Sequence, residues 1–262
     1  MKGNYMSYLL NEISWYDYQD KIKNQHILII PIGATEQHGP HLPLGVDAML
    51  ATAFSLALAK QINGVVAPTL NYGYKSLPLS RGGPFFPGTI DLNGNTLIQL
   101  TKDIVNEFAR DGWKHIVIFN CHYENEAFIL EGADLASKEA GFDSQIFIVN
   151  WWDNLDSHII DQVFDQVPFP GWALEHAAIS ETSLMMYFHP HLVDSTKIPN
   201  DHIEELLHFH SYPPLEGVIP ATGCLHTSHS SSAEKGELIV NNVVNNIVRH
   251  MIPRFKTAAL TH

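Results

Sequence analysis

The run HILIIP at residues 26–31 decides the fold. After its first residue it is short, apolar and uncharged, which is typical of a strand buried on both faces of a sheet. Three runs of the same kind follow, at residues 65–70, 115–120 and 145–151. Helical patterns lie between and after them, at residues 48–62, 96–110, 124–140 and 234–251. Strands that alternate with helices of ten or more residues predict an α/β fold, with a mostly parallel sheet flanked by helices on both faces.

The composition fits a single domain over residues 1–262. Hydrophobic residues make up 45% and charged residues 16% of the chain, a globular balance without a signature of disorder. A formal net charge of −13 would repel phosphate backbones, so no nucleic acid partner is expected. No apolar stretch approaches the roughly 20 residues that cross a bilayer, so no membrane partner is expected either. Two cysteines and an N-terminus unlike a signal peptide predict a cytoplasmic location.

Metal-ligand side chains follow two of the four predicted strands. Glu36 and His38 follow the first strand, with Asp47 at the start of the next helix, and His122 and Glu124 follow the third strand. Residues two apart in an extended segment point the same way. Imidazole and carboxylate ligands suit Zn²⁺ or Mn²⁺. Five ligands exceed what one tetrahedral zinc uses, and Asp47 can bridge two ions, so the pattern predicts two divalent ions per chain.

Each piece of this pattern also has a plainer interpretation. Glu36 and His38 could form a polar turn, Asp47 could cap a helix, and His122 could hydrogen-bond a loop. Two such pairs at the ends of predicted strands, with a third carboxylate near them, favour the metal site over these alternatives.

A third polar group is GWALEH at residues 171–176, which the pattern places at the start of a helix that runs to about Phe188. Glu181 falls in the apolar stripe of this helix, where an acid is expected to have a hydrogen-bonding partner. His176 lies off the stripe and could reach the cleft, although an exposed helix histidine is an equally good interpretation. Trp152 and Trp172 could pack in the core or enclose a flat, partly cationic ligand.

At these residues the sequence resembles the creatininase family, and the resemblance runs through almost the whole chain. The segments that carry it, in order, are GATEQHGPHLPLGVD, NYGYKS, FPGT, NCHYENEAFILEGADLA, GWALEHAAISETSLM and EKGEL. It implies a creatininase-type α/β fold assembled as a homohexamer. It also implies a binuclear centre, usually of zinc with manganese as the activating metal.

The resemblance also implies roles for single residues. The ligand positions match Glu36, His38, Asp47, His122 and Glu124, with Asp47 bridging. Substrate-contacting positions match Ser80, Tyr123 and Trp172. Trp152 matches a mobile tryptophan, and His176 matches the residue that transfers a proton. Apart from the resemblance, we expect Glu175 or Glu181 to orient His176. The position of Ala173 is acidic in creatininases, and this departure concerns the substrate-binding side of the site.

The implied reaction is the reversible hydrolysis of the cyclic amide of creatinine to creatine. In that reaction the metals supply hydroxide for attack on the carbonyl carbon, and His176 protonates the departing ring nitrogen. Glu124 is the alternative acid. Two other functions stay open: a related hydrolase for another cyclic amide, a formamide or an inosose-type ring, which Ala173 favours, and a metal-stabilised binding protein without activity.

Overall fold

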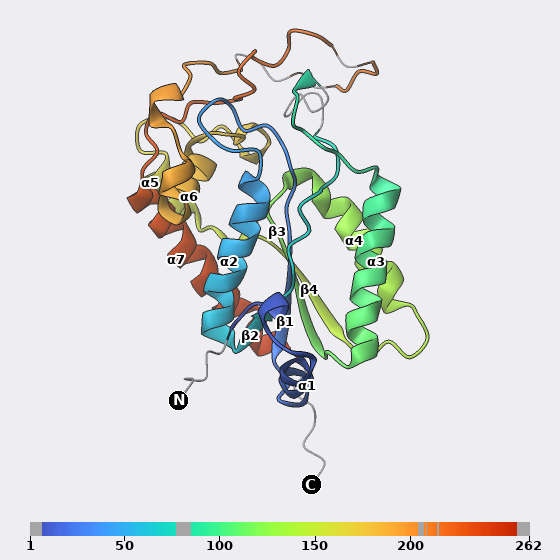
Figure 1. Ribbon diagram of the computed structural model, residues 1–262. Helices are drawn as coiled ribbons and strands as arrows, with labels where there is room; N and C mark the ends of the chain where they lie inside the picture. Colours follow the sequence, from blue (N-terminus) through green and yellow to red (C-terminus); the bar gives the residue numbers. More distant parts are fainter. Residues whose placement is uncertain (1–6, 77–84, 204–206, 208, 214, 256–262) are drawn as a thin grey trace.

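Four parallel strands form one sheet in the order β2-β1-β3-β4 (Figure 1). In this computed structural model, which describes residues 7–76, 85–203, 207, 209–213 and 215–255, the strands are β1 (Ile27–Ile32), β2 (Gly64–Val66), β3 (His115–Asn120) and β4 (Gln145–Asn150). The chain therefore extends the sheet first to one side of β1 and then to the other. In an open α/β sheet, the ligand site lies beyond the carboxyl ends of the strands where the order reverses, here β1 and β3.

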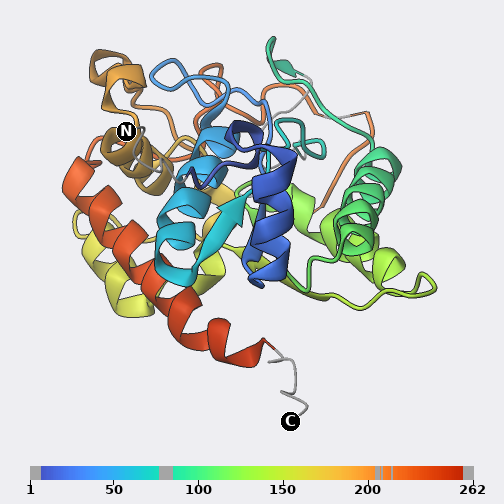
Figure 2. The ribbon, with the colours of Figure 1, turned by 60° about the horizontal axis from the view of Figure 1, so that its bottom comes forward.

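Helices cover both faces of the sheet (Figures 1 and 2). One face carries α2 (Val46–Ile62), α5 (Ser157–Val163), α6 (Ile179–Phe188) and α7 (Ala233–His250). The other face carries α3 (Gly94–Asp111) and α4 (Glu126–Ser137), and α1 (Trp15–Lys23) packs on this second core through Tyr18 and Ile22. The layers confirm the predicted fold class.

Strand β1 supplies both cores because successive side chains of a strand point to opposite faces. Ile27 and Ile29 join the core beneath α2, whereas Leu28, Ile30 and Ile32 join the core beneath α3. Both faces are therefore dry, and this is the physical reason why the run is apolar throughout.

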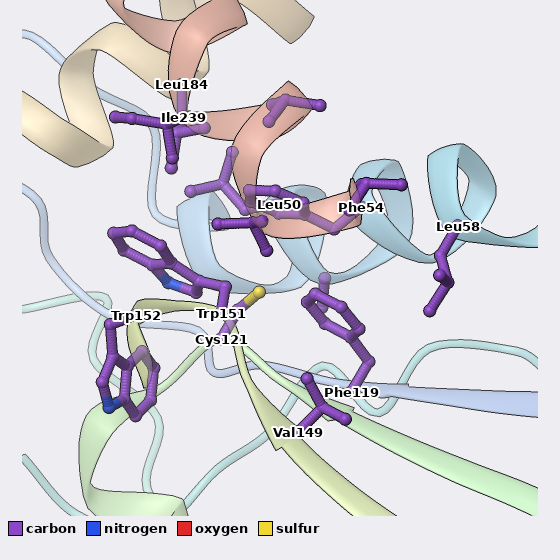
Figure 3. Packing of buried hydrophobic residues seen from close by; sticks show 14 of the residues in the cluster. Leu50, Phe54, Leu58, Phe119, Cys121, Val149, Trp151, Trp152, Leu184 and Ile239 are labelled. Carbon is purple, nitrogen blue, oxygen red and sulfur yellow. The ribbon is translucent and has the colours of Figure 1, made fainter. Parts of the chain in front are cut away.

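The core beneath α2 continues to the carboxyl ends of the strands (Figure 3). The ring of Phe54, from the middle of α2, lies 5.5 Å from that of Phe119 and 6.2 Å from that of Trp151, measured between ring centroids. Beyond these rings come Cys121 and Trp152, which are also buried. An apolar wall thus extends to the edge of the sheet where the polar residues begin.

Two of the predicted elements have wrong boundaries. The strand expected at 65–70 ends at Val66, and Leu70 makes only an isolated bridge with Ile32. The helix expected from Gly171 begins at Ile179, after a short 3-10 turn and a left-handed residue, Ala177, whose φ is 53°. A residue in that conformation cannot continue a right-handed helix.

The other differences are smaller. Helix α4 begins at Glu126, two residues after its predicted start, because a 3-10 turn at Tyr123–Asn125 comes first. Helices α1 and α5 have no counterpart among the predicted elements. Within the described part of the chain, no helix is long and apolar enough to span a membrane.

Gly132 sets the distance between α3 and α4. A Cβ at this position would lie 2.7 Å from the backbone oxygen of Ile98 and 2.7 Å from Cβ of Thr101, both on α3. Helix propensity alone would favour alanine over glycine in mid-helix by about 1 kcal/mol. The close contact with α3 instead favours glycine, because a Cβ would overlap the atoms of that helix.

We expect Gly132→Ala to destabilise the protein by about 1–2 kcal/mol, since overpacking a close helix crossing outweighs the gain in propensity. Urea denaturation measures the change. Glu131→Ala, at the neighbouring exposed position, is the control and should change stability by less than about 0.5 kcal/mol. A more stable Gly132→Ala variant would show that α3 and α4 are not held this closely.

Candidate metal centre

The polar side chains predicted at the strand ends converge at the carboxyl ends of β1 and β3. Glu36 and His38 follow β1, His122 follows β3, and Asp47 lies in the first turn of α2. Gly33 allows this approach, because a Cβ there would lie 2.4 Å from the backbone nitrogen of Ala48. The segment after β1 can therefore cross directly over the start of α2.

One group of converging atoms joins Glu36, Asp47 and His122. Nδ1 of His122 lies 3.2 Å from Oε2 of Glu36 and 3.0 Å from Oδ2 of Asp47. The three side chains are buried. Two carboxylates and one imidazole, all facing one point, form a donor set for a divalent ion such as Zn²⁺ or Mn²⁺.

A second group joins His38, Asp47 and Glu181. Nε2 of His38 lies 3.1 Å from Oδ1 of Asp47 and 3.7 Å from Oε2 of Glu181. Asp47 is therefore common to both groups, and it presents one carboxylate oxygen to each. This is the arrangement of a bridging ligand between two metal ions.

The remaining atoms of these side chains are already hydrogen-bonded. Nδ1 of His38 contacts the backbone oxygen of Glu36 at 3.0 Å, and Nε2 of His122 contacts that of Tyr74 at 2.9 Å. Ser76 donates a hydrogen bond to Oε1 of Glu36 at 2.5 Å. A carbonyl oxygen only accepts hydrogen bonds, so Nδ1 of His38 and Nε2 of His122 carry the hydrogen. The other nitrogen of each ring, which points to one of the two groups, keeps its lone pair.

Five of the six atoms that face the two groups have no hydrogen-bond partner among the described residues; the sixth is Oε2 of Glu181. The five are Oε2 of Glu36, Nε2 of His38, both carboxylate oxygens of Asp47 and Nδ1 of His122. Buried polar atoms in this state are costly. Their donor chemistry and the hydrogen bonds behind them fit divalent metal ions.

Electrostatics leads to the same conclusion. Burial would raise the pKa of Asp47, but the imidazoles of His38 and His122 outweigh it and hold this pKa below its ordinary value. Burial would lower the pKa of both histidines, but the facing carboxylates, with Asp47 foremost, raise it well above its ordinary value. Every ion pair that the structure describes for these carboxylates is with histidine. Without metal ions the cluster must therefore take up protons to balance its charge.

Glu181 is the residue whose part in the site sequence reasoning missed. The sequence predicts Glu181 to be a partner behind the site or a buried hydrogen-bonding group, and Oε2 does accept a hydrogen bond of 2.7 Å from the backbone nitrogen of Ala177. The same atom also belongs to the second group, which the sequence did not predict. An acid in the middle of an apolar stripe was the available signal. Glu124 is buried beside the cluster, with Oε2 3.5 Å from Nε2 of His122, and lies outside both groups. Its role as a ligand stays a prediction.

His176 is buried beside the centre and is not an exposed helix histidine. It lies three residues before α6, with its ring centroid 4.4 Å from that of His38. Gln37 presents two atoms to Nε2 of His176: its backbone oxygen at 2.8 Å and its side-chain nitrogen at 3.0 Å. One can only accept and the other can only donate, so Gln37 can partner this nitrogen with or without a proton.

A narrow aromatic cleft lies next to the second group. It is lined by Cys121, Tyr123, Trp151, Trp152, Trp172, Glu175 and Glu181, and the space within it and at its mouth is about 250 Å³. The space free for water is only about 10 Å³, close to the room that one water molecule needs. Trp151 stands edge-on to both Trp152 and Trp172, at centroid distances of 6.0 and 5.3 Å. The cleft is therefore narrow and is bounded by aromatic rings.

One carboxyl group and one thiol group at this cleft have raised pKa values. Burial, and then the negative charge of Glu181, raise the pKa of Glu175 to about 8. Burial also raises the pKa of the Cys121 thiol well above its ordinary value, as expected for a small hydrophobic residue and not for a nucleophile. Ala173 is half-buried in the turn Trp172–Leu174, and Ser80 lies outside the described residues.

Buried carboxylate and imidazole donors at the reversal point of a parallel sheet define a class of α/β proteins built to hold divalent metal ions. Within that class, the chain belongs to the creatininase family: the family model described as creatinine amidohydrolase matches residues 11–251.

Curated relatives agree with the family. The chain is 38% identical over 247 residues to the creatinine amidohydrolase of Pseudomonas putida, a match that covers 92% of this chain and 95% of the relative. It is 26% identical over 269 residues to a 3-dehydro-scyllo-inosose hydrolase of Thermotoga maritima, covering 92% of this chain and 83% of that protein.

Solved structures of creatininases have the same fold. A Zn–Zn form of a glutamate-to-glutamine mutant matches with a TM-score of 0.92, and a manganese form matches with 0.91, both at 37% identity. A glutamate-to-glutamine mutant complexed with creatine matches with a TM-score of 0.91 at 36% identity. Each match covers 96% of this chain and 100% of the other.

His41 links the segment after β1 to α6 behind the metal centre. Its Nε2 lies 3.0 Å from Oγ1 of Thr182 and 3.4 Å from Oγ of Ser228. Burial, and then the charge of His38, lower the pKa of His41 to about 4 from an ordinary value of 6.5. The unfolded chain therefore binds this proton at higher pH than the folded chain does. Stability from His41 is complete above about pH 6.5 and is lost as the pH falls towards 4.

We expect His41→Gln to reduce the loss of stability on acidification. Between pH 6.5 and 4.5, its free energy of unfolding should fall less steeply than that of the parent, by up to about 1.4 kcal/mol per pH unit. Denaturant unfolding of metal-free protein at several pH values measures the two slopes. His158→Gln, at an exposed position, should follow the parent. Equal slopes for His41→Gln and the parent would contradict the lowered pKa.

Proposed function

We propose that this protein is a metal-dependent amidohydrolase that opens the cyclic amide of creatinine to give creatine, reversibly. The observation that carries the proposal is Asp47, whose two buried oxygens face two separate donor groups. Family membership and the creatinine amidohydrolase of Pseudomonas putida support the choice of substrate.

Two divalent ions, Zn²⁺, Mn²⁺ or one of each, are the proposed cofactors. Glu36, Asp47 and His122 would hold one ion, and His38, Asp47 and Glu181 the other. Ions bound there would lower the pKa of water at the site to about 7 and stabilise negative charge on the carbonyl oxygen of the substrate. The hydrogen bonds behind His38 and His122 keep both rings aimed at these positions.

His176 is proposed to deliver a proton to the departing ring nitrogen. Gln37 can partner Nε2 of His176 in both protonation states, so loss and return of the proton at this atom need no rearrangement. Glu175 is the proposed orienting group, held by the hydrogen bond that the backbone nitrogen of Ser180 donates to it at 3.0 Å. Glu124, beside His122, is the alternative acid.

The aromatic cleft is the proposed substrate site, with Tyr123 and Trp172 as contacts and Trp152 as the ring that moves. Trp152 stands between Tyr123 and Trp151, at centroid distances of 5.5 and 6.0 Å. Aromatic faces suit creatinine, which is flat and partly cationic. Ser80 is proposed as a further contact on the family resemblance alone.

A second candidate substrate is a different cyclic compound. The family resemblance implies an acid at the position of Ala173, next to Trp172 of the cleft, so this chain has one negative charge fewer near an amino-substituted ring. One curated relative of the chain, the 3-dehydro-scyllo-inosose hydrolase, is named for another substrate, which supports this candidate. Ala173 is therefore proposed to set substrate preference.

Several broader properties belong to the same proposal. The span 1–262 is proposed to act as one domain, because elements from Leu9 to Phe255 pack on the two faces of one sheet. Assembly as a homohexamer is proposed on the family resemblance. A cytoplasmic location is proposed on the two free cysteines, which are both buried.

Purified protein loaded with Zn²⁺ or Mn²⁺ should convert creatinine to creatine, and chelation should abolish the activity because the hydroxide source is lost. Metal analysis of the loaded protein should give about two ions per chain. Asp47→Ala should lose both ions, because one residue serves both groups.

Unchanged turnover after complete removal of metal would exclude this mechanism. An intact two-metal protein that is inactive on creatinine but hydrolyses another cyclic amide or an inosose would instead support the second candidate. Asp47→Ala with parental metal content would contradict bridging.

His176→Ala should keep both metals and lose on the order of 100-fold or more in turnover, the usual contribution of general acid–base catalysis. A substrate whose leaving group needs no proton should lose much less. His191→Ala, at an exposed position, is the control. If His176→Ala loses a metal ion, His176 acts as a ligand; if turnover stays normal with both metals bound, the acid is another residue.

A further inference from the structure

Asn125 lies at the centre of a buried network that ties together the segments after three strands. It ends the 3-10 turn that follows β3, and its side chain is fully buried. Its amide nitrogen donates hydrogen bonds to the backbone oxygen of Gly33, after β1, at 3.1 Å, and to Oδ1 of Asn120, on β3, at 3.3 Å. Its amide oxygen accepts a hydrogen bond of 2.7 Å from the backbone nitrogen of Tyr74, after β2.

Tyr74 connects Asn125 to the metal centre, because its backbone nitrogen contacts Asn125 and its backbone oxygen contacts His122. The backbone oxygen of Tyr74 accepts a hydrogen bond from Nε2 of His122 at 2.9 Å. Since a carbonyl oxygen cannot donate, this contact keeps the hydrogen on Nε2 and leaves the lone pair on Nδ1. Nδ1 is the atom that faces Glu36 and Asp47.

The other side of His122 is held by the same network. Asn120 donates a hydrogen bond to the backbone oxygen of His122 at 2.9 Å and accepts one from its backbone nitrogen at 3.2 Å. Oδ1 of Asn120 also accepts from Asn125. His122 is therefore fixed at its backbone through Asn120 and at its ring through Tyr74, and both partners are bonded to Asn125.

The fit around Asn125 leaves little freedom for its amide. A Cβ at Gly73 would lie 2.7 Å from Oδ1 of Asn125 and 2.7 Å from the backbone oxygen of Gly33. A glycine is therefore required where the segment after β2 passes the amide. This close passage is what brings the backbone of Tyr74 within reach of both Asn125 and His122.

We propose that Asn125 is a positioning residue that sets the tautomer and the aim of His122 for one of the two metal ions. The inference rests on the proposed metal centre. The expected effect on metal affinity is selective. The network touches His122 and the backbone before Glu36, whereas no contact described for Asn125 reaches His38 or Glu181. Loss of the side-chain amide of Asn125 should lower the affinity for the ion held by Glu36, Asp47 and His122. It should leave unchanged the affinity for the ion held by His38, Asp47 and Glu181.

The test is a titration of metal-free parent and Asn125→Ala proteins with Zn²⁺ in the presence of a competing chelator, which resolves two stepwise affinities. In Asn125→Ala, one of the two affinities should fall by about 10-fold. This is the lower end of the loss that is usual when the hydrogen-bonding partner behind a ligand is removed, because Asn125 holds that partner, Tyr74, and does not itself contact the ring. The other affinity should change by less than about threefold. Titration with Co²⁺, followed by its visible absorption, should lose the bands of one site only.

Asn246→Ala is the matched control, since Asn246 donates a hydrogen bond of 3.0 Å to the backbone of Asn154, away from the metal centre. It removes a side-chain amide and should leave both affinities unchanged. Asn125→Ser keeps a hydroxyl that can serve one of the three partners, and it should show the same selective loss at smaller size. It replaces the alanine variant if that variant does not fold.

Equal weakening of both sites in a folded Asn125 variant would overturn the proposal and make Asn125 a general structural residue. Unchanged affinities at both sites would overturn it too. A parent protein that binds no Zn²⁺ at all would be a different result, because it would remove the proposed metal centre and this inference with it.

Discussion

The structure depends on the compensation of a fully buried carboxylate. Asp47 has no exposed surface, and its oxygens face His122 and His38, which come from segments far apart in the chain. A charge in such a place must be paired or must bind a cation. Histidines alone can balance the cluster only by taking up protons, so the arrangement favours metal ions over an apolar replacement and links folding of this edge of the sheet to metal binding.

The surrounding fold makes this compensation geometrically possible. Parallel strands place their carboxyl ends at one edge, and the reversal of strand order puts β1 next to β3 there. Gly33 lets the segment after β1 pass within contact of α2, and the buried asparagines hold the backbone around His122. The apolar wall of Phe54, Trp151 and Trp152 keeps water away from one side of the centre. Charges interact more strongly there than they would in water.

At the same edge of the sheet, the buried donor atoms lie beside the aromatic cleft. The donor atoms lie on buried, hydrogen-bonded segments directly after strands, where positions are set by the sheet. The aromatic rings stand at the rim, around a space that holds about one water molecule. In the proposed function, substrate entry displaces an aromatic ring and leaves the donor atoms in place, so the centre stays preorganised.

The sequence by itself predicted the four strands, the layered fold and four residues that the structure brings together in the candidate metal centre: Glu36, His38, Asp47 and His122. It could do so because apolar runs of strand length mark buried strands, and because polar residues directly after parallel strands must meet at one edge. Only the tertiary structure decided that β1 lies between β2 and β3, that Glu181 joins the centre, and that Ala177 delays α6 and leaves His176 buried before it. These features arise from contacts between residues distant in sequence and from one left-handed backbone conformation. The acid in an apolar stripe was a local signal for Glu181, but it did not show which residues Glu181 would meet. The strand order and the conformation of Ala177 leave no periodic pattern in the chain, so local propensity could not reveal them.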